Sequence, residues 1–330
     1  MPQAQVFKKK LHPKTGISMT SDTKSLKSSN TPLSDTSKTT QDFFLGLSAA
    51  IVVVFIWSGW LVISKIGAES KLTIYDIAAL RYGISAIIAF PIVLYLKPWK
   101  DILIHRIIVL TILAGVPYVL LAYAGFTYAP ASHGGVFLNG ALPAMTLALA
   151  WIWLKERPRL QQITGAVLII IGALMAAVEA SVAAVYEAWI GDLLFLTAGL
   201  SFSVYLILNR LWNVTIPLVL LSLSVVSGFL YIPIWYIFLP SALVETTHSQ
   251  ILLQAAYQGL LPNLVGLGLI SIAVRRAGAS ATAAIMSAVP GLGAVLGIVL
   301  LGEILGPMTW MGICIVTLGI LLITIRRHTF

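Results

Sequence analysis

Apolar residues in this chain form long, nearly unbroken blocks that are separated by short polar stretches. A helix that crosses a bilayer needs about 20 predominantly apolar residues. Ten segments reach that length: 44–64, 73–96, 107–128, 132–154, 160–178, 189–209, 215–239, 251–272, 279–301 and 307–325. This pattern predicts an all-α polytopic membrane protein with ten transmembrane helices.

The first 42 residues differ from the rest of the chain. They are rich in Ser, Thr and Lys, and they contain no apolar block long enough for a signal-peptide core. Such a composition cannot bury enough apolar area to offset the entropy of the chain, so residues 1–42 are predicted to form a disordered cytoplasmic tail. An organelle transit peptide is the alternative, but those segments favour arginine and this one has none.

The apolar part of the chain repeats itself at an offset of 147 residues. The recurring positions are Pro143 with Pro290, Glu156 with Glu303, Gly165 with Gly312, and Gly172 with Gly319. Weak internal symmetry of this kind is typical of transporters built from two related halves. The repeats are predicted at 43–180 and 187–327. Because each contains five spans, an odd number, the second repeat must be inverted relative to the first.

Composition and charge agree with a membrane protein. Hydrophobic residues make up 58% of the chain and charged residues 10%, whereas about 25% of a soluble domain is charged. The net charge of +9 does not indicate nucleic-acid binding, because the basic residues lie at the ends of apolar blocks and not in one patch. With the N-terminus in the cytoplasm, 18 of the 21 Lys and Arg residues fall on that side, while Lys65 and Lys71 lie outside. This bias predicts that both termini are cytoplasmic.

The chain carries no motif for catalysis or nucleotide binding. It lacks GxxxxGK[ST], GxSxG and HExxH. The five histidines are scattered, and the single cysteine, Cys314, lies inside an apolar block. The sequence therefore predicts no enzyme, no cofactor and no metal site.

Prolines near the middle of four predicted spans are the first candidates for a functional role: Pro117, Pro143, Pro262 and Pro290. Proline removes a helix hydrogen bond and clashes with the preceding turn, which bends the helix and exposes a carbonyl. The alternative is a static kink that helps the bundle to pack. Because the four prolines form repeat-related pairs, we interpret them as mobile kinks that line a transport pathway.

Polar and aromatic side chains at a similar depth extend this candidate pathway. They are Trp57, Ser58, Tyr118, Asn139, Tyr205, Asn263 and Ser287. An asparagine in hydrocarbon needs hydrogen-bond partners, so Asn139 and Asn263 are predicted to face the interior of the bundle. For each residue, hydrogen bonding between helices is the alternative role.

Four ionisable residues complete the candidates. Arg81, about 12 Å inside the second span, either attracts an anion or is a structural residue tied to carbonyls or to Asp76; the structural interpretation is favoured. His133, near the outer end of the fourth span, is a candidate for protonation near neutral pH. Glu156 and Glu303 each precede a new helix at a membrane boundary, and we interpret them as caps of that helix and not as proton-coupling groups.

Two copies of a five-span unit, each ending in Pro-x12-Glu and then Gly-x6-Gly, resemble the drug/metabolite transporter superfamily, and within it a ten-helix protein with two EamA domains. The Trp57-Ser58-Gly59 run and the ALR at 79–81 are further points of resemblance, which covers about residues 44–325. The resemblance implies an exporter of amino acids or related amphipathic metabolites in the bacterial inner membrane. The inverted repeats imply alternating access.

Other functions remain as alternatives. An uptake carrier or a passive facilitator of the same fold has the same sequence features, whereas a membrane enzyme or receptor would need a catalytic cluster or a large soluble domain. The expected partners are a small-molecule substrate and the lipid bilayer, with a proton as the candidate coupling ion. A homodimer is left open, and no nucleic-acid partner is expected.

Overall fold

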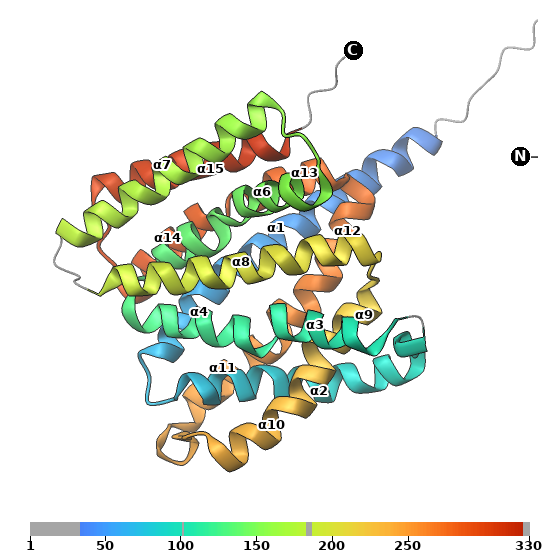
Figure 1. Cartoon of the computed structure of the whole chain (residues 1–330), viewed down its shortest axis with the longest axis vertical. Coiled ribbons are helices and arrows are strands. Elements are labelled where there is room, and N and C mark those ends of the chain that lie inside the picture. The colour runs from blue at the N-terminus through green and yellow to red at the C-terminus, as the bar shows by residue number, and fades with distance from the viewer. Residues whose placement is uncertain (1–33, 101, 183–186, 326–330) are drawn as a thin grey trace, which may run out of the picture.

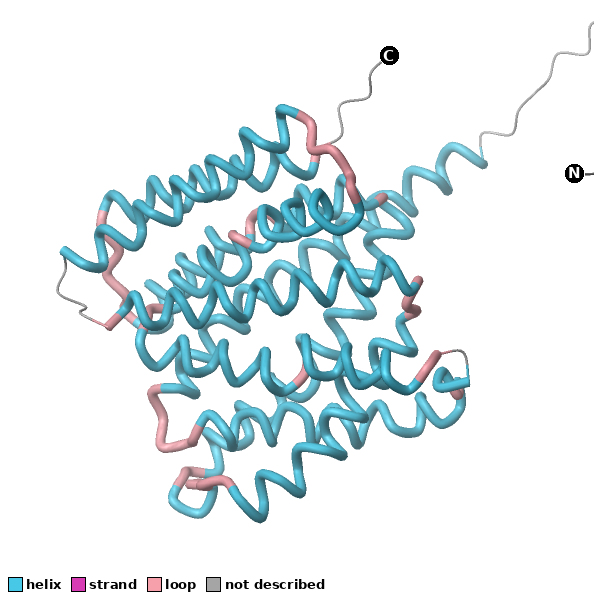
Figure 2. Tube along the Cα trace, viewed as in Figure 1, coloured by secondary structure: helices cyan, strands magenta, loops and turns pink. Residues whose placement is uncertain are grey.

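The computed structural model describes residues 34–100, 102–182 and 187–325. Within these ranges every regular element is a helix, no strand is present, and the connections are short (Figure 2). Ten of the described helices are long and apolar enough to cross a membrane: Thr40–Ala68, Ile74–Leu96, Ile104–Tyr128, Ala131–Leu154, Leu160–Ala180, Ala188–Trp212, Ile216–Phe238, His248–Ala277, Ala279–Leu301 and Pro307–Thr324. The predicted all-α fold with ten spans is confirmed.

The first helix begins earlier than the apolar pattern indicates. It starts at Ser34, so residues 34–42 of the expected tail are helical, while residues 1–33 lie outside the described part of the chain. The apolar pattern locates the part of a helix that crosses hydrocarbon. It does not limit the hydrogen-bonded helix, which continues here into polar sequence.

The first five spans contain α1 (Ser34–Ala68), α2 (Ile74–Leu96), η1 (Pro98–Lys100), α3 (Ile104–Ala114), α4 (Val116–Tyr128), α5 (Ala131–His133), η2 (Gly134–Gly140), α6 (Leu142–Leu154) and α7 (Leu160–Val182). The last five contain α8 (Ala188–Trp212), α9 (Ile216–Leu220), η3 (Leu221–Val226), α10 (Ser227–Phe238), η4 (Leu243–Glu245), α11 (His248–Leu260), η5 (Leu261–Val265), α12 (Gly266–Ala277), α13 (Ala279–Met286), α14 (Val289–Leu301) and α15 (Pro307–Thr324). The elements η1 and η4 are 3₁₀ turns, and the other three η elements are π-helical.

Four spans are interrupted at the mid-membrane prolines. The third span divides into α3 and α4 at Gly115, two residues before Pro117. In the fourth and ninth spans a new helix starts with Pro143 or Pro290 in its first turn, and Pro262 lies in η5. The ring of proline and its missing N–H explain why the regular helix stops there.

The π-helical elements η2, η3 and η5 were not predicted from the sequence. They lie in the fourth, seventh and eighth spans. A π-helical turn holds an extra residue, and such turns are frequent at functional sites. Each of the three elements contributes at least one residue to the lining of the first cavity described below.

The last helices of the two repeats, α7 and α15, lie side by side along one edge of the bundle (Figure 1). A Cβ on Gly172 would come within 2.5 Å of the backbone oxygen of Gly312, and a Cβ on Gly165 within 2.6 Å of that of Gly319. The recurring glycine pairs therefore allow the two backbones to touch, as small residues do between membrane helices.

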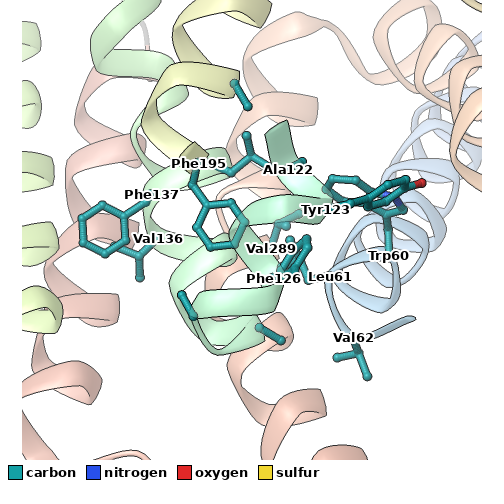
Figure 3. Packing of buried hydrophobic residues seen from close by; sticks show 14 of the residues in the cluster. Trp60, Leu61, Val62, Ala122, Tyr123, Phe126, Val136, Phe137, Phe195 and Val289 are labelled. Carbon is teal, nitrogen blue, oxygen red and sulfur yellow. The ribbon is translucent and has the colours of Figure 1, made fainter. Parts of the chain in front are cut away.

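An aromatic cluster joins the two repeats in the core (Figure 3). It consists of Trp60 on α1, Tyr123 and Phe126 on α4, and Phe195 on α8, all of them buried. The ring of Phe126 meets those of Trp60 and Phe195 edge to face, with centroids 6.0 and 4.7 Å apart. Such pairs contribute about 0.5–1.5 kcal/mol each beyond the burial of area.

Candidate functional site

Two adjoining cavities lie inside the bundle. Their volumes are about 100 and 280 Å³, and Trp57, Asn139 and Leu142 line both of them. The first cavity is also lined by Arg81, Tyr118, Phe202 and Asn263. The second is also lined by Val274, Ala279 and Thr324, and by two of the mid-membrane prolines. Residues from both repeats therefore line two cavities that share part of their walls.

Seven of the twelve site residues predicted from the sequence line these cavities: Trp57, Arg81, Tyr118, Asn139, Pro143, Asn263 and Pro290. They lie on seven different elements, α1, α2, α4, η2, α6, η5 and α14. Polar residues within the spans face the interior of the bundle, which explains why positions from different spans meet at these cavities.

Five predicted residues line neither cavity: Ser58, Pro117, His133, Tyr205 and Ser287. Ser58 donates a hydrogen bond to the backbone oxygen of Val289 (3.1 Å), which ties α1 to α14. Ser287 donates to the backbone oxygen of Ala284 in its own helix (2.6 Å). Pro117 is exposed on the surface of the bundle. Helical spacing shows which residues share a face, but not which neighbour that face meets.

Tyr205 supports the wall of the first cavity from behind. Its ring centroid lies 5.2 Å from that of Phe202, and the Phe202 ring lies 5.1 Å from that of Tyr118. Tyr205 is buried, while the other two rings line the cavity. Its contribution is therefore to hold a cavity residue in place.

His133 has a buried hydrogen-bond partner that the sequence analysis missed. Its Nδ1 lies 2.7 Å from Oδ1 of Asp192, at the start of α8, and both side chains are buried. The pair connects the two repeats. Asp192 is the acidic residue inside the sixth apolar block, and a carboxylate within a span is a readable signal of a functional or structural partner.

Arg81 is held at the first cavity by two neutral amides. Its Nη1 donates to Oε1 of Gln258 (3.2 Å) and its Nη2 to Oδ1 of Asn263 (2.5 Å). The guanidinium carbon lies 5.7 Å from the ring centroid of Trp60, within cation–π range. The expectation that Arg81 is tied to Asp76 or to backbone carbonyls is wrong, because its hydrogen bonds in the structure go to side-chain amides.

Asp76 instead caps the start of its own helix. Its Oδ2 accepts a hydrogen bond from the backbone N–H of Thr73, while Oγ1 of Thr73 accepts one from the N–H of Asp76, both at 3.0 Å. This reciprocal pair is a capping box, with Asp in place of the usual Glu. The carboxylate also accepts hydrogen bonds from Nε1 of Trp235 (3.0 Å) and from the N–H of Ala242 (2.9 Å), so it is fully occupied.

Gln258 on α11 organises the site and was not predicted. Its Oε1 accepts hydrogen bonds from Nε1 of Trp60 and from the hydroxyl of Tyr123, both at 2.9 Å, as well as from Arg81. Its Nε2 donates to Oε1 of Gln254, one turn earlier (3.3 Å). Two glutamines four residues apart within an apolar block lie on one helix face, and this spacing was the available signal.

Glu303 caps a helix, but not the one that follows it. Its carboxylate accepts hydrogen bonds from the backbone N–H groups of Ala131 (2.5 Å) and Ser132 (3.3 Å) at the start of α5, in the other repeat. The following helix, α15, is capped by Glu179, which accepts a hydrogen bond from the N–H of Thr309 (2.7 Å). The sequence interpretation named the correct type of contact and the wrong helix.

Glu156, the repeat equivalent of Glu303, caps none of the helices in the described part of the chain. It forms a two-pronged ion pair with Arg210, with contacts of 2.6 and 2.9 Å between Nη and Oε atoms. Both side chains are exposed. The expectation that Glu156 caps the next helix is therefore wrong as well.

The two ends of the bundle differ in whether a cavity reaches exposed residues there. At the end that holds the start of α1 and the end of α15 (Figure 1), the second cavity reaches the exposed residues Val274 and Ala279. At the opposite end, Nζ of Lys65 donates to the backbone oxygen of Phe126 (2.9 Å) and Glu303 holds the start of α5. The cavities therefore lead toward the first end, while contacts between spans close the second.

Comparisons with known proteins agree with this architecture. The model of the EamA-like transporter family matches residues 44–178 and 189–325. The uncharacterized transporter YwfM of Bacillus subtilis (strain 168) is 29% identical over 194 residues, which are 58% of this chain and 64% of that protein, just under two thirds of its length. A solved crystal structure covers 86% of this chain, and the match covers 98% of that one, with a TM-score of 0.57 and 17% identity; at that identity the likeness concerns the fold alone. Because the family model matches most of the chain, in two copies of five spans, this protein belongs to the EamA-like transporter family.

Proposed function

We propose that this protein is a secondary transporter that exports small metabolites across the bacterial inner membrane by alternating access. In this proposal the structure holds the conformation whose cavities face the cytoplasm. The observation that carries the proposal is that two equivalent glutamates, Glu303 and Glu156, have different kinds of partner. One is bound to a helix start at the closed end, and the other is free of such a contact at the open end.

In the proposed cycle, the repeat predicts the geometry of the opposite conformation. Glu303 binds the N–H groups at 131 and 132, and the offset of 147 residues maps those positions onto Gly278 and Ala279. Here Glu156 instead pairs with the exposed Arg210. If inverted repeats exchange conformations, Glu156 binds the N–H groups at 278 and 279 in the outward-facing state, and Glu303 is released.

The proposed pathway follows the two cavities. Its lining includes the seven residues predicted from the sequence: Trp57, Arg81, Tyr118, Asn139, Pro143, Asn263 and Pro290. A proline break lets one half of a helix bend while the other half stays packed. Bending at Pro143 would move the half of the fourth span that faces the cytoplasm, and bending at Pro290 the outward half of the ninth span.

The proposed orientation places both termini in the cytoplasm, because the basic residues gather at that end of the spans. Two single cysteines test it in a Cys314→Ala background. Ser241→Cys, in the exposed segment between α10 and α11, should react with an impermeant thiol reagent in intact cells. Arg157→Cys, in the exposed segment between α6 and α7, should react only after permeabilisation. The reverse pattern would refute the orientation.

A proton is the proposed coupling ion, with the pair of His133 and Asp192 as its site. Buried ionisable pairs within a membrane are costly and mark functional positions, and histidine titrates near neutral pH. The pair lies beside the start of α5, which Glu303 holds closed. Opening that end would expose His133 to the outer solution. His133→Gln should remove the effect of a pH gradient on transport while leaving counterflow intact.

Transport by the purified protein tests the function as a whole. Proteoliposomes are loaded with a neutralised small-molecule extract of cells, and the released compounds are measured by mass spectrometry with and without a pH gradient. A subset should leave only from vesicles with the wild-type protein, and faster when the gradient drives export. Release that ignores the gradient would support the passive facilitator. Equal release from protein-free vesicles would refute transport.

A further inference from the structure

The cation in the first cavity lacks a counter-charge. Arg81 is 7% exposed, and a guanidinium has five N–H donors and no acceptor. Its two hydrogen bonds go to neutral amide oxygens, one of which also serves Trp60 and Tyr123. Its Nε has no partner. Arg81 is therefore under-satisfied for a buried charge.

No acidic residue among the described cavity residues compensates this charge. Arg81 is the one formally charged side chain that lines either cavity. The ion pairs in the described part of the chain join other residues: Lys65 with Glu69, His133 with Asp192, Arg210 with Glu156, and Arg276 with Asp42. A buried charge without a partner costs several kcal/mol, and an anion beside it would recover much of that energy.

The rest of the lining indicates what the anion is attached to. Nδ2 of Asn139 is a second buried donor without a partner, and Asn139 lines both cavities. The rest of the lining of the first cavity is mostly apolar, with the flat rings of Trp57, Tyr118 and Phe202. Flat rings stack favourably on one another. The guanidinium without a counter-charge, the unpartnered amide and the aromatic walls together fit a small aromatic body that carries an acceptor group.

Resting on the proposed function of this cavity as the substrate site, we propose that the substrates are small aromatic carboxylates without a positive charge. The carboxylate binds Arg81, and the ring lies against Trp57, Tyr118 and Phe202. A charge-assisted pair of this kind is the strong form of hydrogen bond. An ammonium group would have no acid to bind and would be repelled by Arg81. The proposal therefore changes the expected substrate class from amino acids to organic acids without an ammonium group.

A matched series of probes tests the charge preference on the wild-type protein in detergent. Phenylacetate, phenylacetamide, phenethylamine and phenylalanine share one ring and differ in charge. Binding is measured by calorimetry and by the fluorescence of Trp57 and Trp60, which line the cavity. Phenylacetate should bind about tenfold or more tightly than phenylacetamide, phenylalanine should bind more weakly than phenylacetate, and phenethylamine should not bind. Equal affinities for acid and amide, or no binding of phenylacetate at millimolar concentration, would overturn the proposal.

Two variants assign the preference to this cavity. Arg81→Gln should remove the difference between acid and amide, whereas Arg81→Lys should keep part of it, since lysine retains the charge but not the fork geometry. If Arg81→Gln does not fold, Asn139→Asp provides an independent check. Asn139 is half-buried, and its Nδ2 has no partner to lose. Asn139→Asp should weaken phenylacetate and admit phenethylamine; an unchanged series in this variant would place the anion elsewhere.

Flux of the same probes separates this inference from the proposed function. Phenylacetate that binds in a charge-dependent way but does not cross proteoliposomes would support the anion site and refute transport of this class. If compounds from the cell extract are exported but the phenyl probes bind with affinities that do not depend on their charge, the proposed transport function would be supported and the anion site refuted.

Discussion

Removing the charge of Glu303 should open the closed end of the bundle. The carboxylate of Glu303 accepts hydrogen bonds from the N–H groups of Ala131 (2.5 Å) and Ser132 (3.3 Å), which belong to the other repeat. Glu303→Gln keeps the size of the side chain. It replaces one acceptor oxygen with an NH₂ group, which cannot accept from an N–H, and it removes the charge that favours a helix start.

The geometry sets the size of the effect. A hydrogen bond to a charged group contributes about 1.5–3 kcal/mol, and we count one such bond because the contact to Ser132 is long at 3.3 Å. We therefore expect Glu303→Gln to destabilise this conformation by about 1.5–3 kcal/mol relative to the outward-facing one. That difference shifts the equilibrium between the two by about 10-fold to 150-fold.

The assay uses single cysteines at the two ends, in detergent, in a Cys314→Ala background. Ser132→Cys reports on the closed end, because Ser132 is fully buried and its hydroxyl has no partner. Ala283→Cys reports on the second cavity, which it lines. Adding Glu303→Gln should raise the thiol reaction rate at 132 and lower it at 283.

The equivalent change at the other end is the matched control. Glu156 pairs with Arg210 on the surface, and exposed ion pairs contribute about 0–1 kcal/mol. Glu156→Gln should therefore leave both rates nearly unchanged or favour the present conformation further, because it weakens only the proposed outward-facing contact. The reasoning is refuted if Glu303→Gln leaves both rates unchanged, or if Glu156→Gln opens the outer end as much as Glu303→Gln does.

Three further predictions address the pathway and the frame around it. Asn139→Leu should abolish export with an unchanged melting temperature, because Nδ2 of Asn139 has no partner. Asn263→Leu should abolish export and also lower stability by about 1–3 kcal/mol, because it removes the acceptor of a buried hydrogen bond. Equal melting curves for the two variants would contradict this difference. Gly172→Val should lower stability by about 1–3 kcal/mol through a clash with the facing backbone, while Gly268→Ala, with nothing within 4 Å of the new Cβ, should be neutral or slightly stabilising, as thermal unfolding in detergent would show. Pro143→Ala should insert normally with an unchanged or raised melting temperature, yet it should slow turnover by straightening the fourth span. Wild-type flux in proteoliposomes would reduce Pro143 to a packing residue.

The spans and the duplication were readable because hydrocarbon imposes a simple rule. Side chains that lie in hydrocarbon must be apolar over about 20 residues, so every span appears as a long apolar block, and its backbone polar groups must be satisfied within the segment, so the block is a helix. The glycine pairs were readable as part of the repeat, but the reason for them was not. Their role depends on α7 and α15 meeting backbone to backbone, with Gly172 against Gly312, and the sequence does not state which spans are neighbours.

The site was predicted only in part, for the same reason. Asn139 and Asn263 were found because an amide in an apolar block needs a partner, and the same rule applied to Gln258 and Asp192 would have found the central hydrogen-bond acceptor and the partner of His133. Glu303 shows the remaining difficulty. A carboxylate at a helix boundary predicts a cap, but the helix it caps is the one nearest in space, and that helix lies 171 residues away in the sequence.

In the proposed mechanism, the static spans are unbroken helices and the moving spans are helices interrupted at proline. The contact of α7 with α15 depends on glycines that lie against the facing backbone, where an added Cβ would come within 2.5–2.6 Å of a backbone oxygen. Sliding one helix along the other would bring larger side chains into that position. Both helices run without an internal break. The fourth and ninth spans, in contrast, are broken at Pro143 and Pro290. Glu303 joins these same two spans, because it follows the ninth and binds the start of the fourth. The proposed hinge and the contact that holds it closed therefore act on the same two spans, and a change at either one should alter access without disturbing the contact between α7 and α15.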